Sequence, residues 1–304
     1  MKYIFIINPA AGKGTGQKTL IAQIPQLLPA EQYEIYYTTG PGDGQRFAAD
    51  CVKNSKGITD ITLFACGGDG TLFEVINGVN GQVPVGVIPC GSGNDFVKNI
   101  ITQQNLSDLS VHLNGKTVPL DLIRCNGNLV SNVCNIGFDA NIAHNMNRFK
   151  HLPLVSGKAA YLLSAVYCFF HRLDYPMTIQ VDDQPPITGN FLFALLANGQ
   201  IYGGSFRGAP LASVCDGLLD VCFCQKVPRL TLLRFLRPFQ SGTYLQNRTC
   251  QSFIQYRKCR KIRINLHQPT ITGYDGNITS TTIMEAELLP AAMQLLIPLD
   301  ATLK

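Results

Sequence analysis

The chain has 304 residues, of which 46% are hydrophobic and 15% charged, with a formal net charge of +5 and a pI near 8.6. This composition suits one large or two ordinary globular domains and excludes low-complexity and repeat architectures. The mild positive charge suits partners that carry phosphate but falls short of the profile of nucleic-acid-binding proteins, so we expect no nucleic-acid partner. The 11 scattered cysteines lack zinc-ligand spacing and fit a reduced cytosol.

Two apolar segments bear on membrane topology. The first, at the N-terminus, is too short for the core of a signal peptide and has no small-residue cleavage site after it. The longest, residues 152–170, includes a serine, a glycine and a lysine, and so lacks the roughly 20 clean residues that a bilayer span needs. We therefore expect a cytoplasmic protein, with any membrane contact peripheral.

Residues 1 to about 125 alternate short apolar runs with helical patterns. The expected strands are Tyr3–Ile7, Tyr33–Tyr37, Ile61–Cys66 and Val83–Pro89, and the expected helices are Thr15–Leu28, Gln45–Val52, Leu72–Asn77 and Asn94–Ile101. This alternation predicts βαβ units and a mostly parallel sheet. Since ligands of such sheets bind beyond the carboxyl ends of the strands, the loops after Ile7, Cys66 and Pro89 form the candidate site.

Beyond residue 125 the pattern changes to many short β-rich runs. The expected strands are Leu129–Asn135, Thr178–Asp182, Phe191–Ala197, Leu218–Cys224, Lys261–Leu266 and Met293–Pro298, and the expected helices are Gly157–Arg172 and Arg229–Gln240. This pattern predicts a second, predominantly antiparallel domain. The boundary is open by several residues, because residues 120–126 could belong to either part.

The first candidate phosphate-binding turn is Gly67-Gly68-Asp69-Gly70-Thr71, which follows an apolar strand and opens a helix. Glycines let backbone N–H groups approach a phosphate closely, and the helix N-terminus adds partial positive charge. A carboxylate in such a turn repels phosphate unless it holds a magnesium ion or the water around one. The alternative is a tight glycine turn whose aspartate caps the helix.

Two further turns follow the first and fourth strands. Residues 8–14 form a basic strand-to-helix turn, which is not a Walker A loop because Gly16 is followed by Gln17. Residues 89–96 are again rich in glycine. They end in Asn94 and Asp95, which could bind a ligand or simply cap the next helix.

Together, residues 8–12, 67–78 and 91–96 resemble the diacylglycerol kinase catalytic-domain family, in particular the bacterial lipid kinases. The resemblance continues, in the family's order, through residues 119–121, 135–139, 215–220 and 274–276, and so covers nearly the whole chain. GGDGT also occurs in NAD kinases and, in a related form, in phosphofructokinases, so the later motifs make the distinction.

The resemblance implies two domains. The first is an α/β domain with a mostly parallel sheet, like that of phosphofructokinases and NAD kinases, over residues 1–125, with residues 290–304 returning to it. The second is a β-rich antiparallel sandwich over residues 126–289, which binds the lipid. Catalysis is expected in the cleft between them.

The resemblance further implies an ATP-dependent lipid kinase that transfers the γ-phosphoryl group to the hydroxyl of diacylglycerol or a similar lipid. Asp69, Asp95 and Asp121 are expected to organise Mg²⁺ and its waters around the phosphates. The expected nucleotide-binding residues are Asn8, Pro9, Ala10, Ala11, Gly12, Thr38, Gly67, Gly68, Asp69, Gly70, Thr71, Leu72, Phe73, Ser92, Asn94 and Asp95.

A second, structural Mg²⁺ is implied in the loop at residues 213–218. Its expected ligands are the carboxylate of Asp216 and main-chain oxygens of Ser213 and Leu218, with water completing the octahedron. Without the resemblance, Asp216 and the following glycine read as a plain hairpin turn.

The sequence departs from the family near the C-terminus. Members usually read Asp-Gly-Glu, and the glutamate is taken as the base that receives the lipid hydroxyl's proton, but here Asn277 follows Asp275 and a glycine. An amide cannot accept a proton at neutral pH, and neither Glu285 nor Glu287 fills the motif position. Asp275 could act as the base, the reaction could proceed slowly with little base help, or the protein could bind nucleotide without turnover.

The lipid side rests on weaker patterns. Residues 191–196 and 198–204 could line an acyl-chain slot, although such a run is more often a core strand. Residues 228–237 mix bulky apolar side chains with three arginines, as an interfacial helix does. The five positive charges of residues 257–263 could attract anionic head groups or form the wet face of a strand. We expect a lipid substrate at a membrane surface, and the resemblance leaves room for a homodimer.

Two other functions stay open. A soluble small-molecule kinase of the NAD-kinase type would share GGDGT but has no use for the basic and apolar stretches of the second domain. A nucleotide-binding regulator with impaired catalysis would account for Asn277.

Overall fold

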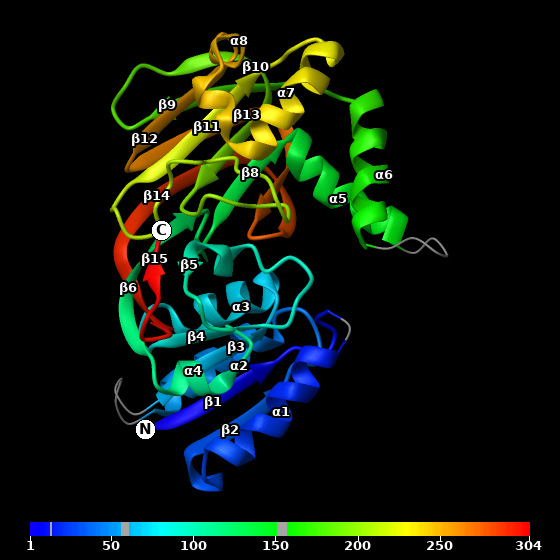
Figure 1. The fold of residues 1–304 in the computed structure, drawn as a ribbon. Coiled ribbons are helices and arrows are strands. Elements are labelled where there is room, and N and C mark those ends of the chain that lie inside the picture. The colour runs from blue at the N-terminus through cyan, green and yellow to red at the C-terminus, as the bar shows by residue number, and fades with distance from the viewer. Residues whose placement is uncertain (13, 56–60, 151–156) are drawn as a thin grey trace.

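The computed structural model describes residues 1–12, 14–55, 61–150 and 157–304. Lys13 of the first turn and residues 152–156 of the long apolar stretch lie outside these described residues. Figure 1 shows an α/β part built from the N-terminal third of the chain and a β-rich part stacked on it, with helix α6 at one side. None of the helices in the described residues is long and apolar enough to cross a membrane.

The described secondary structure consists of helices and strands with the following bounds. The strands are β1 (Lys2–Ile7), β2 (Tyr33–Tyr37), β3 (Ile61–Gly67), β4 (Val85–Pro89), β5 (Ile100–Ile101), β6 (Lys116–Cys125), β7 (Asn128–Val130), β8 (Val133–Gly137), β9 (Tyr175–Val181), β10 (Ile187–Ala197), β11 (Leu219–Gln225), β12 (Ile254–Cys259), β13 (Lys261–Tyr274), β14 (Asn277–Ile297) and β15 (Thr302–Leu303). The α-helices are α1 (Thr15–Leu27), α2 (Asp43–Asn54), α3 (Asp69–Val79), α4 (Leu109–Leu113), α5 (Phe138–Lys150), α6 (Gly157–Phe170), α7 (Arg229–Ser241) and α8 (Arg248–Gln251). Short 3₁₀ helices span Ala30–Gln32, Phe96–Asn99 and Thr243–Gln246.

The N-terminal part is built on the parallel strands β2, β1, β3 and β4, which pair in this order. All seven positions of β3 are buried, as expected for the centre of a parallel sheet. The four strands predicted here are confirmed to within two residues at each end. Because the strands are parallel, the loops after Ile7, Gly67 and Pro89 open at the same edge of the sheet.

The C-terminal part is antiparallel. Strands β12, β11, β10, β8 and β13 pair in this order, and β9 pairs with both β10 and β13. Residues 191–196 lie in β10 and are fully buried in the core, so the alternative of a core strand holds and this run lines no acyl-chain slot. The predicted architecture, an α/β half followed by an antiparallel β-rich half, is confirmed.

One strand pair runs through both halves (Figure 1). The 21-residue strand β14 pairs first with β13, then with β6, and its last residues join β4 in parallel. The register along β6 shifts between Leu289 and Met293, which marks a bulge where β14 passes from one half to the other. Because β6 and β14 continue across the junction, the domain boundary near residue 125 stays a prediction.

Two predicted elements are corrected, and two observed elements were not predicted. The helix expected at residues 94–101 is only a 3₁₀ turn followed by the short strand β5, because Asn94 has a left-handed φ of 48°. The strand expected at residues 129–135 is interrupted between β7 and β8, where backbone amides donate to the Asp275 carboxylate. The polar helix α5 and the strand β12 were not predicted.

Candidate functional site

The three predicted turns line one groove of about 710 Å³. Close approach of their backbones requires glycine at two places. A side chain on Gly12, whose φ is +60°, would collide with the carbonyl of Cys90. A Cβ on Gly91 would lie 2.5 Å from the Cα of Gly68. The lining residues are Asn8, Pro9, Ala10, Ala11, Gly12, Thr38, Thr39, Gly40, Pro41, Gly68, Asp69, Gly70, Thr71, Glu74, Gly91, Ser92, Gly93, Asp275, Gly276 and Asn277.

Hydrogen bonds hold the turns against one another. The Asn8 side-chain amide donates to the Thr71 hydroxyl at 3.2 Å, which links the first turn to the second. The backbone amides of Cys90 and Gly91 donate to the Gly67 carbonyl at 2.8 and 3.1 Å, which links the second turn to the third. The groove is therefore a fixed feature of the fold, lined mainly by main chain.

Five residues predicted to contact the nucleotide do not line the groove, namely Gly67, Leu72, Phe73, Asn94 and Asp95. The Leu72 and Phe73 side chains are buried in the hydrophobic cores that α3 packs against. The Asn94 side chain exchanges hydrogen bonds with the amide and carbonyl of Gly91 and so closes its own turn. These residues shape the groove from behind and do not line it.

Glu74 was not predicted, although it lies in the GGDGT-containing segment. Its two carboxylate oxygens accept from the backbone amides of Gly42 and Gly44 at 2.8 and 2.9 Å. It thereby ties the start of α2 to α3 beside the groove. The sequence gives no signal for this contact, because the partners are backbone groups 30 and more residues away.

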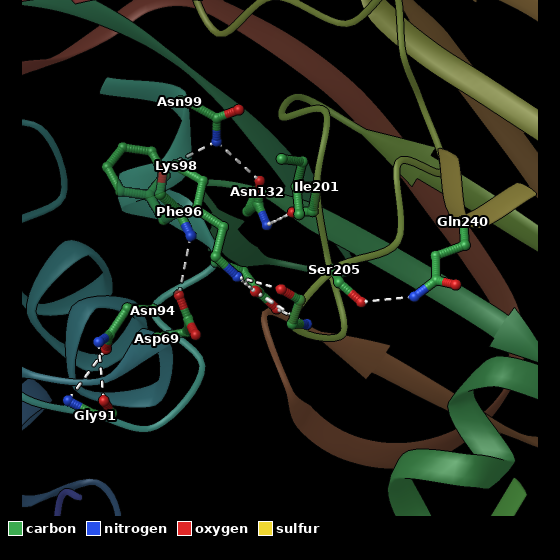
Figure 2. A network of polar contacts seen from close by, with 12 residues as sticks. Asp69, Gly91, Asn94, Phe96, Lys98, Asn99, Asn132, Ile201, Ser205 and Gln240 are labelled. Atoms are coloured by element: carbon green, nitrogen blue, oxygen red, sulfur yellow. Dashed lines mark hydrogen bonds and ion pairs between the residues drawn. The ribbon is translucent and has the colours of Figure 1, made fainter. Parts of the chain in front are cut away.

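Asp69 begins α3 and faces the space between the two halves of the protein. One of its oxygens, Oδ1, accepts from the Phe96 amide at 3.0 Å (Figure 2). Burial and then the negative charge of Asp95 raise its pKa, even though the Phe96 bond opposes the shift. A half-buried carboxylate whose ionised form is disfavoured by its surroundings is suited to bind a cation.

A second, smaller cavity of about 140 Å³ adjoins the groove. Asp69, Asp275 and Gly276 line both spaces. Four carboxylates face the cavity, those of Asp69, Asp95, Asp139 and Asp275. The other lining residues are Asn132, Val133, Asn135, Ala143, Tyr161, Tyr202, Gly203, Gly276 and Ile278.

The polar loops on either side of this cavity are joined across the domain junction (Figure 2). Asn99 donates to the Asn132 side chain at 3.2 Å, and Asn132 in turn donates to the Ile201 carbonyl at 2.9 Å. Asp95 forms an ion pair with Lys98 and accepts from the Gly204 amide at 3.1 Å. Asp95 therefore lines the smaller cavity and helps to fix the junction.

Asp275 is buried in the tight turn between β13 and β14, with a left-handed φ of 46°. Its Oδ2 accepts from the amide and hydroxyl of Ser131 at 2.7 and 2.8 Å, and its Oδ1 accepts from the amides of Asn132 and Val133 at 3.1 and 2.8 Å. Burial raises its pKa to about 6, against these hydrogen bonds. Both oxygens already accept two hydrogen bonds each, so no lone pair of Asp275 is free to meet the hydrogen of an acceptor hydroxyl.

Asn277 lines the groove, and its side-chain amide donates to the Tyr274 carbonyl at 3.3 Å. The two glutamates that follow it in sequence lie elsewhere. Glu285 forms an ion pair with Arg263, and Glu287 forms one with Arg124, both outside the groove and the smaller cavity. Neither supplies the carboxylate that position 277 lacks.

Asp139 lies in the segment 135–139 that resembles the family, but no role was predicted for it. It lies in the first turn of α5, and its Oδ2 accepts from the Asn135 side-chain amide at 3.0 Å and from the Tyr202 hydroxyl at 3.1 Å. Burial raises its pKa to about 6. The signal in the sequence was the position of this aspartate, two residues after the end of the buried strand β8.

Asp121 is the clearest correction. It was expected to organise Mg²⁺ at the phosphates, but it lines neither the groove nor the smaller cavity. Its buried oxygens accept from the amides of Ala291 and Gly217, both at 2.7 Å. Asp121 therefore fastens the bulge of β14 and the loop at residues 213–218 to β6.

The predicted structural Mg²⁺ site does not fit its residues. Asp216 accepts from the Leu218 amide through Oδ1 and from the Lys258 ammonium through Oδ2 at 2.5 Å. The same ammonium lies 3.4 Å from the fully buried Asp220. Burial alone would lower the pKa of Lys258, but its bond to Asp216 and the charge of Asp220 raise it. A lysine thus engages the Asp216 carboxylate that was expected to bind the metal.

Replacing Lys258 with methionine is expected to make stability depend on divalent cations. The change leaves Asp216 and the buried Asp220 without their cation, so the Tm falls by about 5 °C in EDTA and recovers when MgCl₂ is added. The wild-type Tm is expected to be the same in EDTA and MgCl₂. Lys261→Met, which removes an ion pair to the exposed Asp183, is the matched control. A wild-type Tm that rises with Mg²⁺ would contradict the internal-cation assignment.

Unlike the loop at residues 213–218, Asp69 is suited to bind a magnesium ion that arrives with a nucleotide. Within residues 1–12, 14–55, 61–150 and 157–304, no three His, Cys, Asp or Glu side chains are grouped to hold a metal alone. A nucleotide-bound Mg²⁺ needs only one or two carboxylates, because phosphates and water supply the other ligands. Asp69 is half-buried, lines the groove, and carries a raised pKa that a cation would lower again.

Each half of the chain matches a known protein family. Residues 2–125 match the diacylglycerol kinase catalytic domain, and residues 132–297 match the YegS C-terminal NAD kinase beta sandwich-like domain. A diacylglycerol kinase of Bacillus subtilis is 25% identical over 278 residues, which cover 89% of this chain and 88% of the relative.

Solved structures agree on the fold. A diacylglycerol kinase from Bacillus anthracis superposes with a TM-score of 0.70 at 21% identity, over 97% of this chain and 96% of that chain. An NAD kinase from Archaeoglobus fulgidus, solved in complex with ATP, superposes with a TM-score of 0.52 at 13% identity, over 97% of this chain and 94% of that chain. The expected likeness of the fold to NAD kinases is confirmed.

Proposed function

The chain belongs to the diacylglycerol kinase family, and from this premise we propose that it transfers the γ-phosphoryl group of ATP to the hydroxyl of diacylglycerol or a similar membrane lipid. The observation that carries the proposal is the junction of two spaces. A groove lined by glycine-rich backbone meets a small carboxylate-lined cavity at Asp69. This arrangement suits a triphosphate on one side and an acceptor hydroxyl on the other.

In the proposed reaction the turns at residues 8–12, 67–71 and 91–93 hold the phosphates through backbone amides. Bound Mg²⁺ would neutralise the charge on the phosphate oxygens, with Asp69 as its protein ligand. The loops joined through Asn99 and Asn132 keep the two spaces in a fixed relation. Phosphoryl transfer depends mainly on this positioning and charge neutralisation.

The test is a transfer assay with γ-labelled ATP, Mg²⁺ and a panel of acceptors. The panel contains diacylglycerol, phosphatidylglycerol, a sphingoid base and an undecaprenol-like alcohol in mixed micelles, with NAD as the soluble alternative. We expect label in a lipid product and none in NADP. Label in NADP alone would favour the NAD-kinase alternative, and ATP binding without any product would favour a regulator.

We further propose that the protein meets its lipid at an anionic membrane surface through α6 and α7. The exposed leucines of α7, Leu230, Leu233 and Leu236, lie on one helix with the exposed Arg234 and Arg237. This mixture of apolar side chains and arginines is typical of an interfacial helix.

Helix α6 extends the same surface. Arg229 at the start of α7 donates to the carbonyls of Phe169 and His171 at the end of α6, which joins the two helices. Leu162 and Phe170 of α6 are 65% and 69% exposed, and Tyr161 of the same helix lines the small cavity. A membrane bound here would lie next to the proposed acceptor site.

The basic run at residues 257–263 supports this surface less than expected. Lys258 is engaged by Asp216, Lys261 by Asp183 and Arg263 by Glu285. The residues alternate between buried and exposed along β13, as in a strand with one wet face. Their charge is therefore largely neutralised within the protein.

The double variant Leu233→Glu/Leu236→Glu is expected to weaken binding to vesicles containing phosphatidylglycerol by roughly tenfold or more, since it replaces apolar contact with like charge. Co-sedimentation at low salt measures it. Leu299→Glu, at a 68% exposed leucine near the C-terminus, is the control and should bind as the wild type does. Equal loss in both variants would contradict the assignment of α7.

A further inference from the structure

Position 277 lacks the family's carboxylate, and the nearby Glu74 of the groove is held by the backbone amides of Gly42 and Gly44. The wild-type chain has an amide there, and Glu285 and Glu287 are engaged elsewhere. If the lipid hydroxyl gives up its proton within the protein, another carboxylate must accept it. The four carboxylates of the small cavity are the candidates.

Three of these carboxylates already have other partners or another expected role. Asp275 has two donors on each oxygen. Asp95 is paired with Lys98 and accepts from the Gly204 amide. Asp69 begins the glycine-rich turn and lines the groove, where a phosphate-bound cation would be met. Each of these would have to break an existing interaction in order to take a proton.

Asp139 differs from the other three. Its Oδ2 is held by Asn135 and Tyr202, whereas within the described residues the hydrogen bond to its Oδ1 comes from the backbone amide of Ala140, at 2.9 Å. A carboxylate oxygen has two lone-pair directions, so one direction on Oδ1 is open. Among the described residues no cation is paired with Asp139.

We propose that Asp139 is the catalytic base of this chain and takes the place of the glutamate that position 277 lacks. The proposal rests on the proposed lipid kinase function. Asp139 lines the same cavity as Asp69 and Asp275, at the junction with the groove. An acceptor hydroxyl that reaches the γ-phosphate through this cavity passes Asp139.

The step balances without any further reactant. The lipid hydroxyl oxygen attacks the γ-phosphorus while its proton passes to Oδ1 of Asp139. The bond between the γ-phosphorus and the bridging oxygen breaks, and ADP leaves with that electron pair. Protonated Asp139 then returns its proton to water as the phosphorylated lipid departs.

The surroundings of Asp139 tune it for this role. Burial raises its pKa to about 6, which makes it a stronger base than an exposed aspartate and leaves it ionised at neutral pH. The Tyr202 and Asn135 bonds oppose that shift and hold Oδ2 in place. The other titratable groups that face the cavity are Asp69, Asp95, Asp275, Tyr161 and Tyr202.

The test measures kcat and the lipid KM from pH 5 to 8, with Mg-ATP and diacylglycerol in mixed micelles. In the wild type we expect log kcat to fall with unit slope below about pH 6. Asp139→Asn should lower kcat by about 10²-fold at pH 7.5 with little change in KM, and should remove the acidic limb. Adding Asn277→Glu to Asp139→Asn should restore at least tenfold, because a carboxylate returns to the family position.

Tyr202→Phe is a second probe that keeps the carboxylate. Loss of its hydroxyl removes a bond that stabilises ionised Asp139, so the acidic limb of log kcat should move to higher pH. Asp139→Asn with wild-type kcat, or Tyr202→Phe with an unmoved limb, overturns the proposal while leaving the kinase function standing. A wild-type protein that phosphorylates no lipid overturns both.

Discussion

Asp275→Ala is expected to lower the free energy of unfolding by roughly 3–5 kcal/mol, which approaches the whole stability of many domains. The reason is the number of donors that converge on one buried carboxylate. The backbone amides of Ser131, Asn132 and Val133 all donate to it, and alanine leaves them buried without an acceptor. Chemical denaturation followed by circular dichroism measures the change.

Asp275→Asn is the matched control. Asparagine tolerates the left-handed φ of 46° and keeps one carbonyl oxygen, so it should be destabilised by less than the alanine variant. Equal destabilisation of both variants would mean that charge on residue 275, and not the supply of acceptors, holds the turn. A loss below about 1 kcal/mol in the alanine variant would contradict the role of Asp275 as a fastening residue.

The pH dependence of the same residue has a definite sign. Burial raises the folded-state pKa of Asp275 to about 6, above its ordinary value of 3.8. Between these values the folded state binds more protons than the unfolded state, so this group makes the protein more stable as the pH falls from 7 towards 4. Asp275→Asn should lack that part of the gain.

The N-terminal α/β half was the more predictable half from sequence. Its strands are continuous apolar runs, and its turns combine glycine with a helix start, so local pattern and fold agree. The close approach of the turns at Gly12 and Gly91 could be predicted in the same way, because only glycine permits it. The loops at the strand ends are neighbours once the strands are parallel, and a sequence can specify that much.

The contacts that were not predicted join residues far apart in the chain. Asp121 meets Ala291 across 170 positions, at a bulge whose place in β14 no local pattern fixes. Asp139 meets Tyr202 across 63 positions, and Lys258 meets Asp216 across 42. In each case residue type was visible in the sequence, but the partner was set by strand register.

The expected helix at residues 94–101 failed for a local reason that was visible. Asn94 tolerates the left-handed conformation and uses its side chain to close a turn on Gly91, which competes with helix formation. The amide of Phe96 then turns towards Asp69 and not into a helix. A turn of this kind serves the site, since it brings the third loop against the second.

Asp69→Asn is expected to lower kcat by roughly 10³- to 10⁴-fold, because several kcal/mol of charge neutralisation at the phosphates depend on its carboxylate. The asparagine oxygen can still accept from the Phe96 amide, so the turn should keep its shape. Lipid phosphorylation is measured against total Mg²⁺, and the variant should need more Mg²⁺ for half its maximal rate.

The thermal stability of Asp69→Asn should not fall with its activity. Burial and the neighbouring Asp95 raise the pKa of Asp69, so its ionised form is disfavoured in the folded protein without ligand. A neutral isostere removes that penalty, and the Tm of Asp69→Asn at pH 7.5 should equal or exceed the wild-type value. Asp95→Asn, which gives up the Lys98 ion pair, is the control and should keep activity within about tenfold. An active Asp69→Asn variant, or one that melts well below the wild type, would show that this carboxylate serves the fold and not the phosphates.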